Sequence, residues 1–296
     1  MANIEQLLGE NSARVSLELE KYLKTPEKEV DGVYDAMRYS ALSGGKRIRP
    51  FLVRSFAELF GGTEEKAIAY ECAIELIHVS SLIYDDMPCM DNDDYRRGKL
   101  TNHKVYGEAL AVLSGDAMNM KAFEIAASND KTSVESRLRA VLLLSGLAGG
   151  VGMIGGQHID IISENKKVDF DSLLNMHSKK TGALIRASAL LGCCAAELND
   201  PSDERVKNAE KYASGIGLAF QIKDDILDVE GDEKILGKAV HADEKLDKTT
   251  FLSFMSIDEA KEYAKRETEK AIDCIKQYNG SEVLTELACW LLNRNK

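Results

Sequence analysis

Residues 80–98 read SSLIYDDMPCMDNDDYRRG, a stretch in which five aspartates are followed directly by two arginines. Apolar residues before it recur at helical spacing, and Pro88 predicts that this helix ends or kinks just ahead of it, because proline removes a backbone hydrogen bond. Asp85 and Asp86 are therefore expected on the last turn of a helix. On an ideal helix Asp91 would be rotated away from them. The three carboxylates can converge only because the chain leaves the helix at this point.

A second acidic cluster lies far downstream in residues 220–230, which read FQIKDDILDVE. Asp224 and Asp228 are four residues apart, so they share one face of an unbroken helix, where like charges repel. A solvated acidic face is the ordinary interpretation of one such motif by itself. Two clusters, each embedded among apolar residues, instead predict helices that pack in the fold and present carboxylates.

The rest of the chain predicts an all-α fold. There are only four prolines in 296 residues, and Ala, Leu, Glu and Lys are abundant, which favours long helices over strands. We expect a single domain, residues 1–296, of ten or more helices around a central cavity. Loops are predicted at residues 61–63, 128–133, 163–171, 199–203 and 231–248, and the last of these is long enough to form a lid.

Charge and composition exclude several classes of partner and location. The net charge of -11 argues against binding of nucleic acids or anionic membranes. Six cysteines without a C-x-x-C pair are typical of reduced thiols and predict a cytoplasmic protein. The N-terminus does not resemble a secretory signal. The uncharged stretch Ala140–Gly156 contains six glycines, so we expect a closely packed buried helix there and no membrane span.

The carboxylates predict a magnesium site. Close carboxylates are unfavourable unless a cation or a proton relieves them, and a set of oxygen ligands without His or Cys suits a hard ion. Mg2+ typically takes one or two carboxylates and completes its coordination with ligand phosphates. Two facing clusters would hold a diphosphate through Mg2+ ions, which explains how an acidic site can receive an anion.

Basic residues in glycine-rich or helix-end contexts accompany both clusters. Each is more often a solubilising surface charge, but a phosphate could approach the glycine backbone while arginine side chains bind it. His78 lies two helical turns before Asp85 and so on the same face. The basic segments are residues 44–50 (GGKRIRP), Arg96 with Arg97, residues 179–182 (KKTG), residues 237–238 (GK) and residues 248–250 (KTT).

Five segments together resemble the successive motifs of the trans-isoprenyl diphosphate synthases, in particular bacterial short-chain farnesyl and geranylgeranyl diphosphate synthases. They are GGKRIRP, HVSSLIYDDMPCMDNDDYRRG, GGQHIDI, HSKKTGALI and GLAFQIKDDILDVEGD, and they occur in the family's order between about Tyr39 and Phe251. The closing LACWLLNRNK resembles the end of the family more weakly. The resemblance implies an all-α fold around a deep cavity, a homodimer, and condensation of allylic diphosphates with isopentenyl diphosphate.

The resemblance also implies residue roles. It assigns Mg2+ ligands to Asp85, Asp86, Asp91, Asp224, Asp225 and Asp228. It assigns the allylic diphosphate to Arg96, Lys180, Thr181, Gln221, Lys238 and Lys248, of which Lys180, Thr181, Gln221 and Lys238 would also serve catalysis. It assigns isopentenyl diphosphate to Lys46, Arg49, His78 and Arg97, and supporting positions to Gln157 and Asp160. His241 departs from the glycine of many relatives in the predicted lid.

Other classes of protein remain as alternatives. A terpene cyclase would share the first aspartate motif but carry a different second motif, and a non-catalytic subunit of a mixed synthase would be expected to lack aspartates. An acidic helical binding protein would leave the ordered cations unexplained. Many bacterial farnesyl diphosphate synthases have an aromatic residue five positions before the first aspartate, whereas Ser80 and Ser81 lie in this region. We therefore expect a twenty-carbon product, with fifteen carbons as the alternative.

Overall fold

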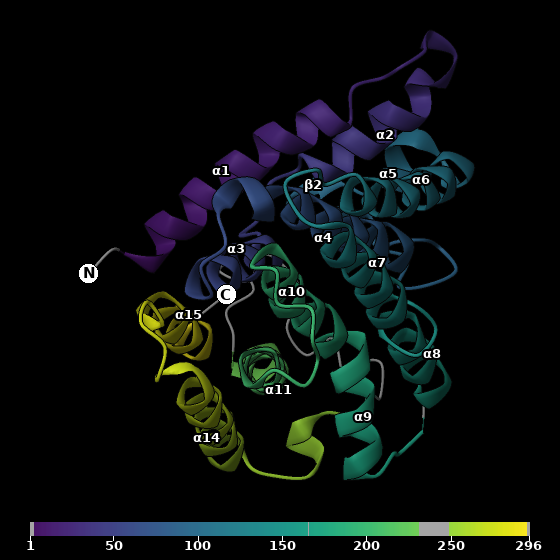
Figure 1. The fold of residues 1–296 in the computed structure, drawn as a ribbon. Coiled ribbons are helices and arrows are strands. Elements are labelled where there is room, and N and C mark those ends of the chain that lie inside the picture. The colour runs from purple at the N-terminus through teal and green to yellow at the C-terminus, as the bar shows by residue number, and fades with distance from the viewer. Residues whose placement is uncertain (1–2, 165, 231–248, 295–296) are drawn as a thin grey trace.

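A computed structural model describes residues 3–164, 166–230 and 249–294, and the predicted all-α fold class is confirmed (Figure 1). The elements are α1 (Ile4–Tyr22), η1 (Lys28–Val30), α2 (Asp31–Ala41), α3 (Ile48–Leu59), α4 (Glu64–Asp85), β1 (Tyr95–Arg96), β2 (Lys99–Leu100), α5 (Asn102–Tyr106), α6 (Glu108–Ala127), α7 (Val134–Ala148), α8 (Met153–Ser163), α9 (Phe170–Lys180), α10 (Gly182–Ala195), α11 (Glu204–Glu230), η2 (Phe251–Ser253), α14 (Ile257–Ile275) and α15 (Glu282–Asn293). The predicted loop at 231–248 lies outside the described residues.

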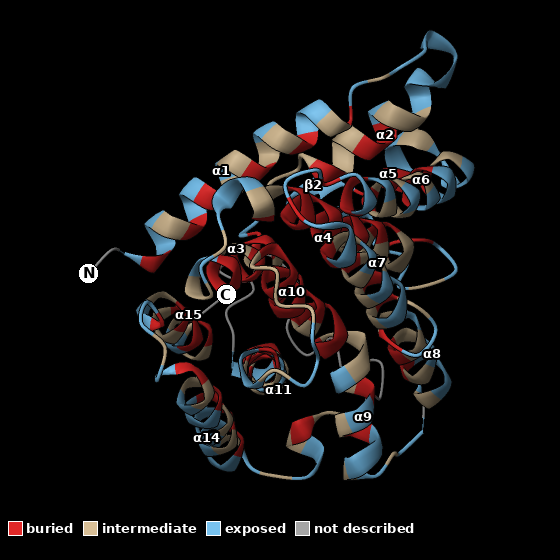
Figure 2. Cartoon of the chain, in the orientation of Figure 1, coloured by how far each residue is buried: buried red, intermediate tan, exposed pale blue. Residues whose placement is uncertain are grey.

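The central helix is α10. Every residue of α10 except Arg186 is buried, and the helix packs against α3, α4, α7 and α11. Figure 2 shows the other helices around it, with buried faces turned inward and exposed faces outward. Small side chains make this arrangement possible: a Cβ on Gly192 would come within 2.6 Å of the Phe56 side chain on α3. The apolar composition of α10 therefore reflects its place in the core.

The helix that carries the first acidic cluster ends where proline predicts. α4 ends at Asp85, and the backbone N–H of Asp91 then donates to the Asp85 carbonyl at 2.9 Å across the turn that contains Pro88. The chain continues into a short hairpin of two antiparallel strands, β1 and β2, in which Tyr95 pairs with Leu100. This turn brings Asp91 back beside the end of α4 and places the two arginines close behind it.

The prediction of one buried helix over Ala140–Gly156 is wrong. The segment forms the end of α7 and the start of α8, separated by a break at Gly149–Gly152, and only some of its side chains are buried. The backbone is tight at this break, where a Cβ on Gly152 would lie 2.0 Å from the Leu147 carbonyl oxygen, so glycine is required there. Leu142 and Ile154 are 55% and 59% exposed.

Two helical stretches among the described residues have the length and apolar composition that a membrane span requires. The first is α4, of which 72% is buried inside the fold, as expected for a core helix. The second is Val134–Ser163, which combines α7 and α8 and is 22% buried.

Candidate functional site

A long apolar cavity of about 710 Å3 begins at the end of α4. Asp85 and His78 line this cavity, and its walls are formed by residues of α4, α6, α7, α8 and α10. Ser80 and Ser81 both line the cavity, as the sequence predicts, and so does Gln157. Its apolar lining includes Ile77, Phe123, Ala148, Met153, Ile161 and Leu184. An apolar chain several isoprene units long fits the volume and chemistry of this space.

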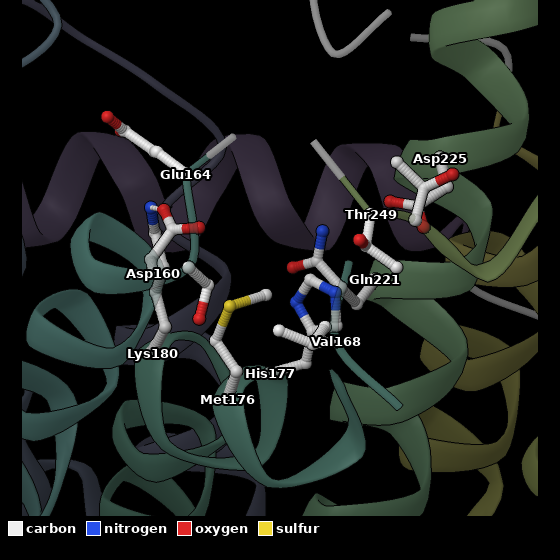
Figure 3. Close-up of a pocket in the computed structure, with 11 residues that line it drawn as sticks. Asp160, Glu164, Val168, Met176, His177, Lys180, Gln221, Asp225 and Thr249 are labelled. Carbon is white, nitrogen blue, oxygen red and sulfur yellow. Dashed lines mark hydrogen bonds and ion pairs between the residues drawn. The ribbon is translucent and has the colours of Figure 1, made fainter. Parts of the chain in front are cut away.

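A smaller polar pocket of about 110 Å3 adjoins the cavity, and Lys180 lines both. In Figure 3 Asp160 and Lys180 stand on one side of this pocket, while Gln221, Thr249 and Asp225 stand on the other. The ammonium group of Lys180 donates to Asp160 Oδ2 at 2.5 Å. Burial lowers the pKa of Lys180, but the Asp160 carboxylate outweighs it and the pKa is raised, so the lysine stays charged. The polar pocket therefore carries a fixed cation at the mouth of the apolar cavity.

Close packing of two helices places this lysine. A Cβ on Gly156 of α8 would lie 2.1 Å from the backbone nitrogen of Lys180, so only glycine lets α8 approach the end of α9. The next residue, Thr181, donates from Oγ1 to Gln221 Oε1 at 2.9 Å. The structure thus brings together Lys180, Thr181 and Gln221, which sequence analysis assigned to one place.

The first acidic cluster is partly neutralised by protein groups. Burial raises the pKa of Asp85 to about 6; Lys180 opposes this shift and the Asp91 carboxylate adds to it. Asp86 turns to the other side of the helix end, where Arg96 donates to it from Nε at 2.6 Å. Asp85 and Asp91 are therefore the members of the cluster that face Lys180 and the mouth of the cavity.

The second cluster is held by protein groups as well. Asp224 forms an ion pair with Arg294 at the end of α15, whose guanidinium lies 3.9 Å from the centre of the Phe220 ring. Asp225 Oδ2 accepts from the backbone N–H of Phe251 at 2.8 Å. Asp228 is buried. Only Asp224 of this set has a partly exposed carboxylate, with 31% of the side chain accessible.

The donor set fits a hard divalent cation. Within the described ranges, no three His, Cys, Asp or Glu side chains converge as a ready-made metal cluster. Asp85 and Asp91 nevertheless supply oxygen donors. The raised pKa of Asp85 shows that its negative charge is unfavourable in this buried place, and a bound cation would stabilise that charge. Such oxygen ligands, completed by water and phosphate oxygens, suit Mg2+.

A cationic cluster lies beside the mouth of the cavity, next to the first acidic cluster. Arg49 Nη1 lies 3.5 Å from His78 Nε2. Burial lowers the pKa of Arg49, and the positive charge of nearby Arg97 lowers it further. Arg97 donates to the Gly44 carbonyl and rests on Gly45, where a Cβ would come within 2.6 Å of the guanidinium.

Lys46 follows in the same loop, with its ammonium 4.8 Å from the centre of the Trp290 ring. Lys46 thus comes from the same loop as the glycines that contact Arg97, and its ammonium lies against α15. Burial and the neighbouring guanidinium groups also hold the pKa of His78 well below its usual value, so its ring is neutral.

Sequence reasoning missed several residues that shape the site. Arg294 reaches Asp224, and Asn119 hydrogen-bonds with the Ser80 hydroxyl at 2.7 Å. The family-like end of the chain could have pointed to Arg294; nothing local points to Asn119, because its partner lies on another helix. Lys238 and Lys248, which the sequence assigns to the allylic diphosphate, lie outside the described residues.

The sequence and the fold both resemble those of known proteins. A family model described as polyprenyl synthetase matches residues 30–288. The chain is 44% identical to the farnesyl diphosphate synthase of Bacillus subtilis (strain 168), over 78% of this chain and 78% of that protein. It is 42% identical to the geranylgeranyl diphosphate synthase of Cyanophora paradoxa, over 89% and 88%. The apo crystal structure of a FPP/GFPP synthase from Zymomonas mobilis matches with a TM-score of 0.87 and 35% identity, covering 98% of this chain and 99% of that one.

Proposed function

The chain belongs to the polyprenyl synthetase family, and from this premise we propose that it is a Mg2+-dependent short-chain trans-prenyltransferase. It condenses allylic diphosphates with isopentenyl diphosphate to give farnesyl or geranylgeranyl diphosphate and pyrophosphate. One observation carries the proposal: an apolar cavity of about 710 Å3 starts at Asp85 and Lys180, where a diphosphate and its cations would sit. Charged chemistry at the mouth and room for a hydrocarbon chain behind it are what prenyl transfer needs.

Ionisation of the allylic substrate is the first step. Asp85, Asp91 and Asp224 would hold Mg2+ ions, which supply Lewis-acid stabilisation of the departing pyrophosphate. Asp86, Asp225 and Asp228 belong to the same proposed set of metal residues. Asp86 accepts a hydrogen bond from Arg96 and Asp225 accepts one from the backbone of Phe251, as Asp224 pairs with Arg294, so each of these three would keep a protein partner beside the cations.

The protein's own cations complete the binding of both substrates. Lys180, fixed by Asp160, faces the allylic diphosphate and neutralises charge that develops on its oxygens. Arg49, Arg97 and Lys46 bind isopentenyl diphosphate without a metal, since they already form a positive cluster.

The bond-forming step takes place between these two groups of residues. The C–O bond of the allylic substrate breaks and its electrons leave with pyrophosphate, and the double bond of isopentenyl diphosphate attacks the cation. A proton then leaves the adduct to the released pyrophosphate. Thr181 and Gln221, joined by a hydrogen bond of 2.9 Å, present neutral oxygens near the reacting carbons. Water would quench the cation, and the apolar walls behind them exclude it.

Product length is set by the floor of the cavity. Ser80 is buried and lines the cavity, and it has a small side chain where an aromatic ring would block a growing tail. The tail can therefore pass Ser80 towards Phe123 on α6 and Ala148 on α7. We infer a twenty-carbon main product, and fifteen carbons is the alternative.

A homodimer would cover the exposed apolar side chains of α6 and α7. Leu113 and Met120 on α6 are 54% and 66% exposed, and Leu138 and Leu142 on α7 are 60% and 55% exposed. These helices pack against each other, and exposed apolar side chains on neighbouring helices are of the kind that obligate interfaces bury. A cytoplasmic location stays a prediction from the spacing of the cysteines.

Pyrophosphate release tests the proposal against the competing classes. Purified protein is expected to release pyrophosphate only when Mg2+, an allylic diphosphate and isopentenyl diphosphate are all present. A terpene cyclase would release it from the allylic substrate alone, and a non-catalytic subunit would release none. The change Asp85→Ala should lower turnover by orders of magnitude, whereas Asp94→Ala, at an exposed carboxylate of the same segment that pairs with Lys104, should change it little. Undiminished turnover in Asp85→Ala or in excess chelator would contradict the metal assignment.

A further inference from the structure

A separate cavity of about 250 Å3 lies between α9, α10, α11 and α14. In Figure 1 α11 lies between α9 and α14, and on the opposite side of α10 from α4 and α6. None of the residues assigned above to metal or substrates lines it. Its lining combines a guanidinium, an imidazole, three hydroxyls and apolar surface, from Arg186, His177, Ser178, Ser214, Leu218 and Tyr263.

Arg186 is the unusual member of this lining. It is the one residue of α10 that is not buried, in a helix that otherwise packs as core. Its Nε atom is nevertheless inaccessible and has no hydrogen-bond partner. No aspartate or glutamate in the described parts of the chain forms an ion pair with Arg186. A half-buried cation without a counter-charge is unfavourable, and an anionic group in the cavity would relieve it.

His177 forms the wall between this cavity and the polar pocket of Figure 3, because it lines both. Neither of its ring nitrogens has a hydrogen-bond partner. Its ring stacks on Phe251 with the centroids 5.3 Å apart, and the backbone N–H of Phe251 holds Asp225 at 2.8 Å. A group bound beside His177 is thus connected by direct contacts to the second acidic cluster.

We propose that this cavity binds a small organic anion, a carboxylate or phosphate carried on a ring, and that its occupancy alters Mg2+ binding through His177, Phe251 and Asp225. Arg186 binds the anionic group with its planar guanidinium, and the hydroxyls of Ser178 and Ser214 lie at the rim. Tyr263 and Leu218 contact the apolar part. A volume of about 250 Å3 restricts the ligand to one ring.

Binding is tested with phenyl phosphate and benzoate as probes, by calorimetry on the full chain in chelator and without substrates. Arg186→Leu is expected to weaken binding about tenfold or more, because a hydrogen-bonded charge pair is lost. Ser214→Tyr, which fills the cavity from an exposed position, should abolish binding. Arg137→Leu on α7 is the matched control, since Arg137 also has an unpartnered Nε but lines neither cavity. Absence of binding, or equal affinity in wild type and Arg186→Leu, would overturn the site.

The connection to the metal is tested separately and rests on the proposed function. Saturating phenyl phosphate should shift the Mg2+ concentration for half-maximal pyrophosphate release by about fivefold or more, as expected for coupled sites. Arg186→Leu should remove this shift while keeping its basal activity. An equal shift in Arg186→Leu, or none in wild type that binds the probe, would overturn the coupling. Failure of the prenyltransferase assay itself would leave the binding measurement intact, so the two proposals fail independently.

Discussion

The change Ser80→Tyr is expected to shorten the product from twenty carbons to fifteen or fewer. Ser80 lies five residues before Asp85 on α4, which places it roughly 7.5 Å from the metal end of the helix. It is buried and lines the apolar cavity, so a phenol ring at this position must project into the path of the tail or displace packed neighbours. Asn119 on α6, 2.7 Å from the Ser80 hydroxyl, closes the opposite side.

The size of the effect follows from the cost of overpacking. Forcing extra atoms into packed space costs about 1–3 kcal/mol, and about 1.36 kcal/mol corresponds to a tenfold change in rate. The condensation that extends the fifteen-carbon chain should therefore slow by about 5- to 150-fold relative to the step before it. The first condensation involves the shortest tail, and its rate serves as an internal control for folding.

The assay is chromatography of the products that wild type and variants form from dimethylallyl and isopentenyl diphosphates. Ser80→Ala is the matched control, because it removes the hydrogen bond to Asn119, worth about 1 kcal/mol, without adding bulk. Its product should keep the wild-type length. An active Ser80→Tyr enzyme whose products match those of wild type would show that the tail does not pass this residue, and a fifteen-carbon wild-type product would refute the inferred length.

Three further predictions concern two arginines of the segment GGKRIRP and the histidine beside them. Arg47→Met should lower the free energy of unfolding by about 3–5 kcal/mol, because it leaves the buried Glu75, now 3.2 Å from Arg47, without its partner. Adding Glu75→Leu should recover most of the loss in urea denaturation, and an unchanged double variant would contradict the pairing. Arg49→Ala should raise the KM for isopentenyl diphosphate more than that for the allylic substrate; the reverse selectivity would exchange the two sites. Burial holds the pKa of the His78 ring well below 6.5 in the folded protein, so the ring is protonated more readily in the unfolded chain. The free energy of unfolding should therefore fall as the pH drops through 6.5. His78→Gln should flatten that slope, and parallel profiles would argue against a neutral ring.

Local sequence was sufficient where local chemistry decides the structure. Pro88 ends the helix of the first acidic cluster, and the structure ends α4 at Asp85. The scarcity of proline and the helical spacing of apolar residues predicted an all-α fold, because backbone propensity and periodicity act over a few residues. The i, i+4 spacing of Asp224 and Asp228 likewise placed both on α11.

Only the tertiary structure separated residues that look equivalent in sequence. In the segment GGKRIRP, Arg47 turns into a left-handed conformation and pairs with buried Glu75, whereas Arg49 faces His78. Asp85 faces the cavity while its neighbour Asp86 turns to Arg96. Adjacent residues on a helix point in different directions, and which direction meets solvent or a partner depends on the packing of other helices.

The sequence by itself determined the helical fold class, the positions of the two acidic clusters and the family, since these depend on residue type, spacing and order along the chain. The tertiary structure decided that Ala140–Gly156 is broken into two helices with exposed apolar side chains, that Arg294 reaches Asp224 and that Arg186 faces a cavity of its own. Each of these outcomes depends on groups far apart in the chain that folding brings within a few ångströms. The free energy of such contacts is set by burial and by the neighbouring charges, and neither is encoded in any short segment.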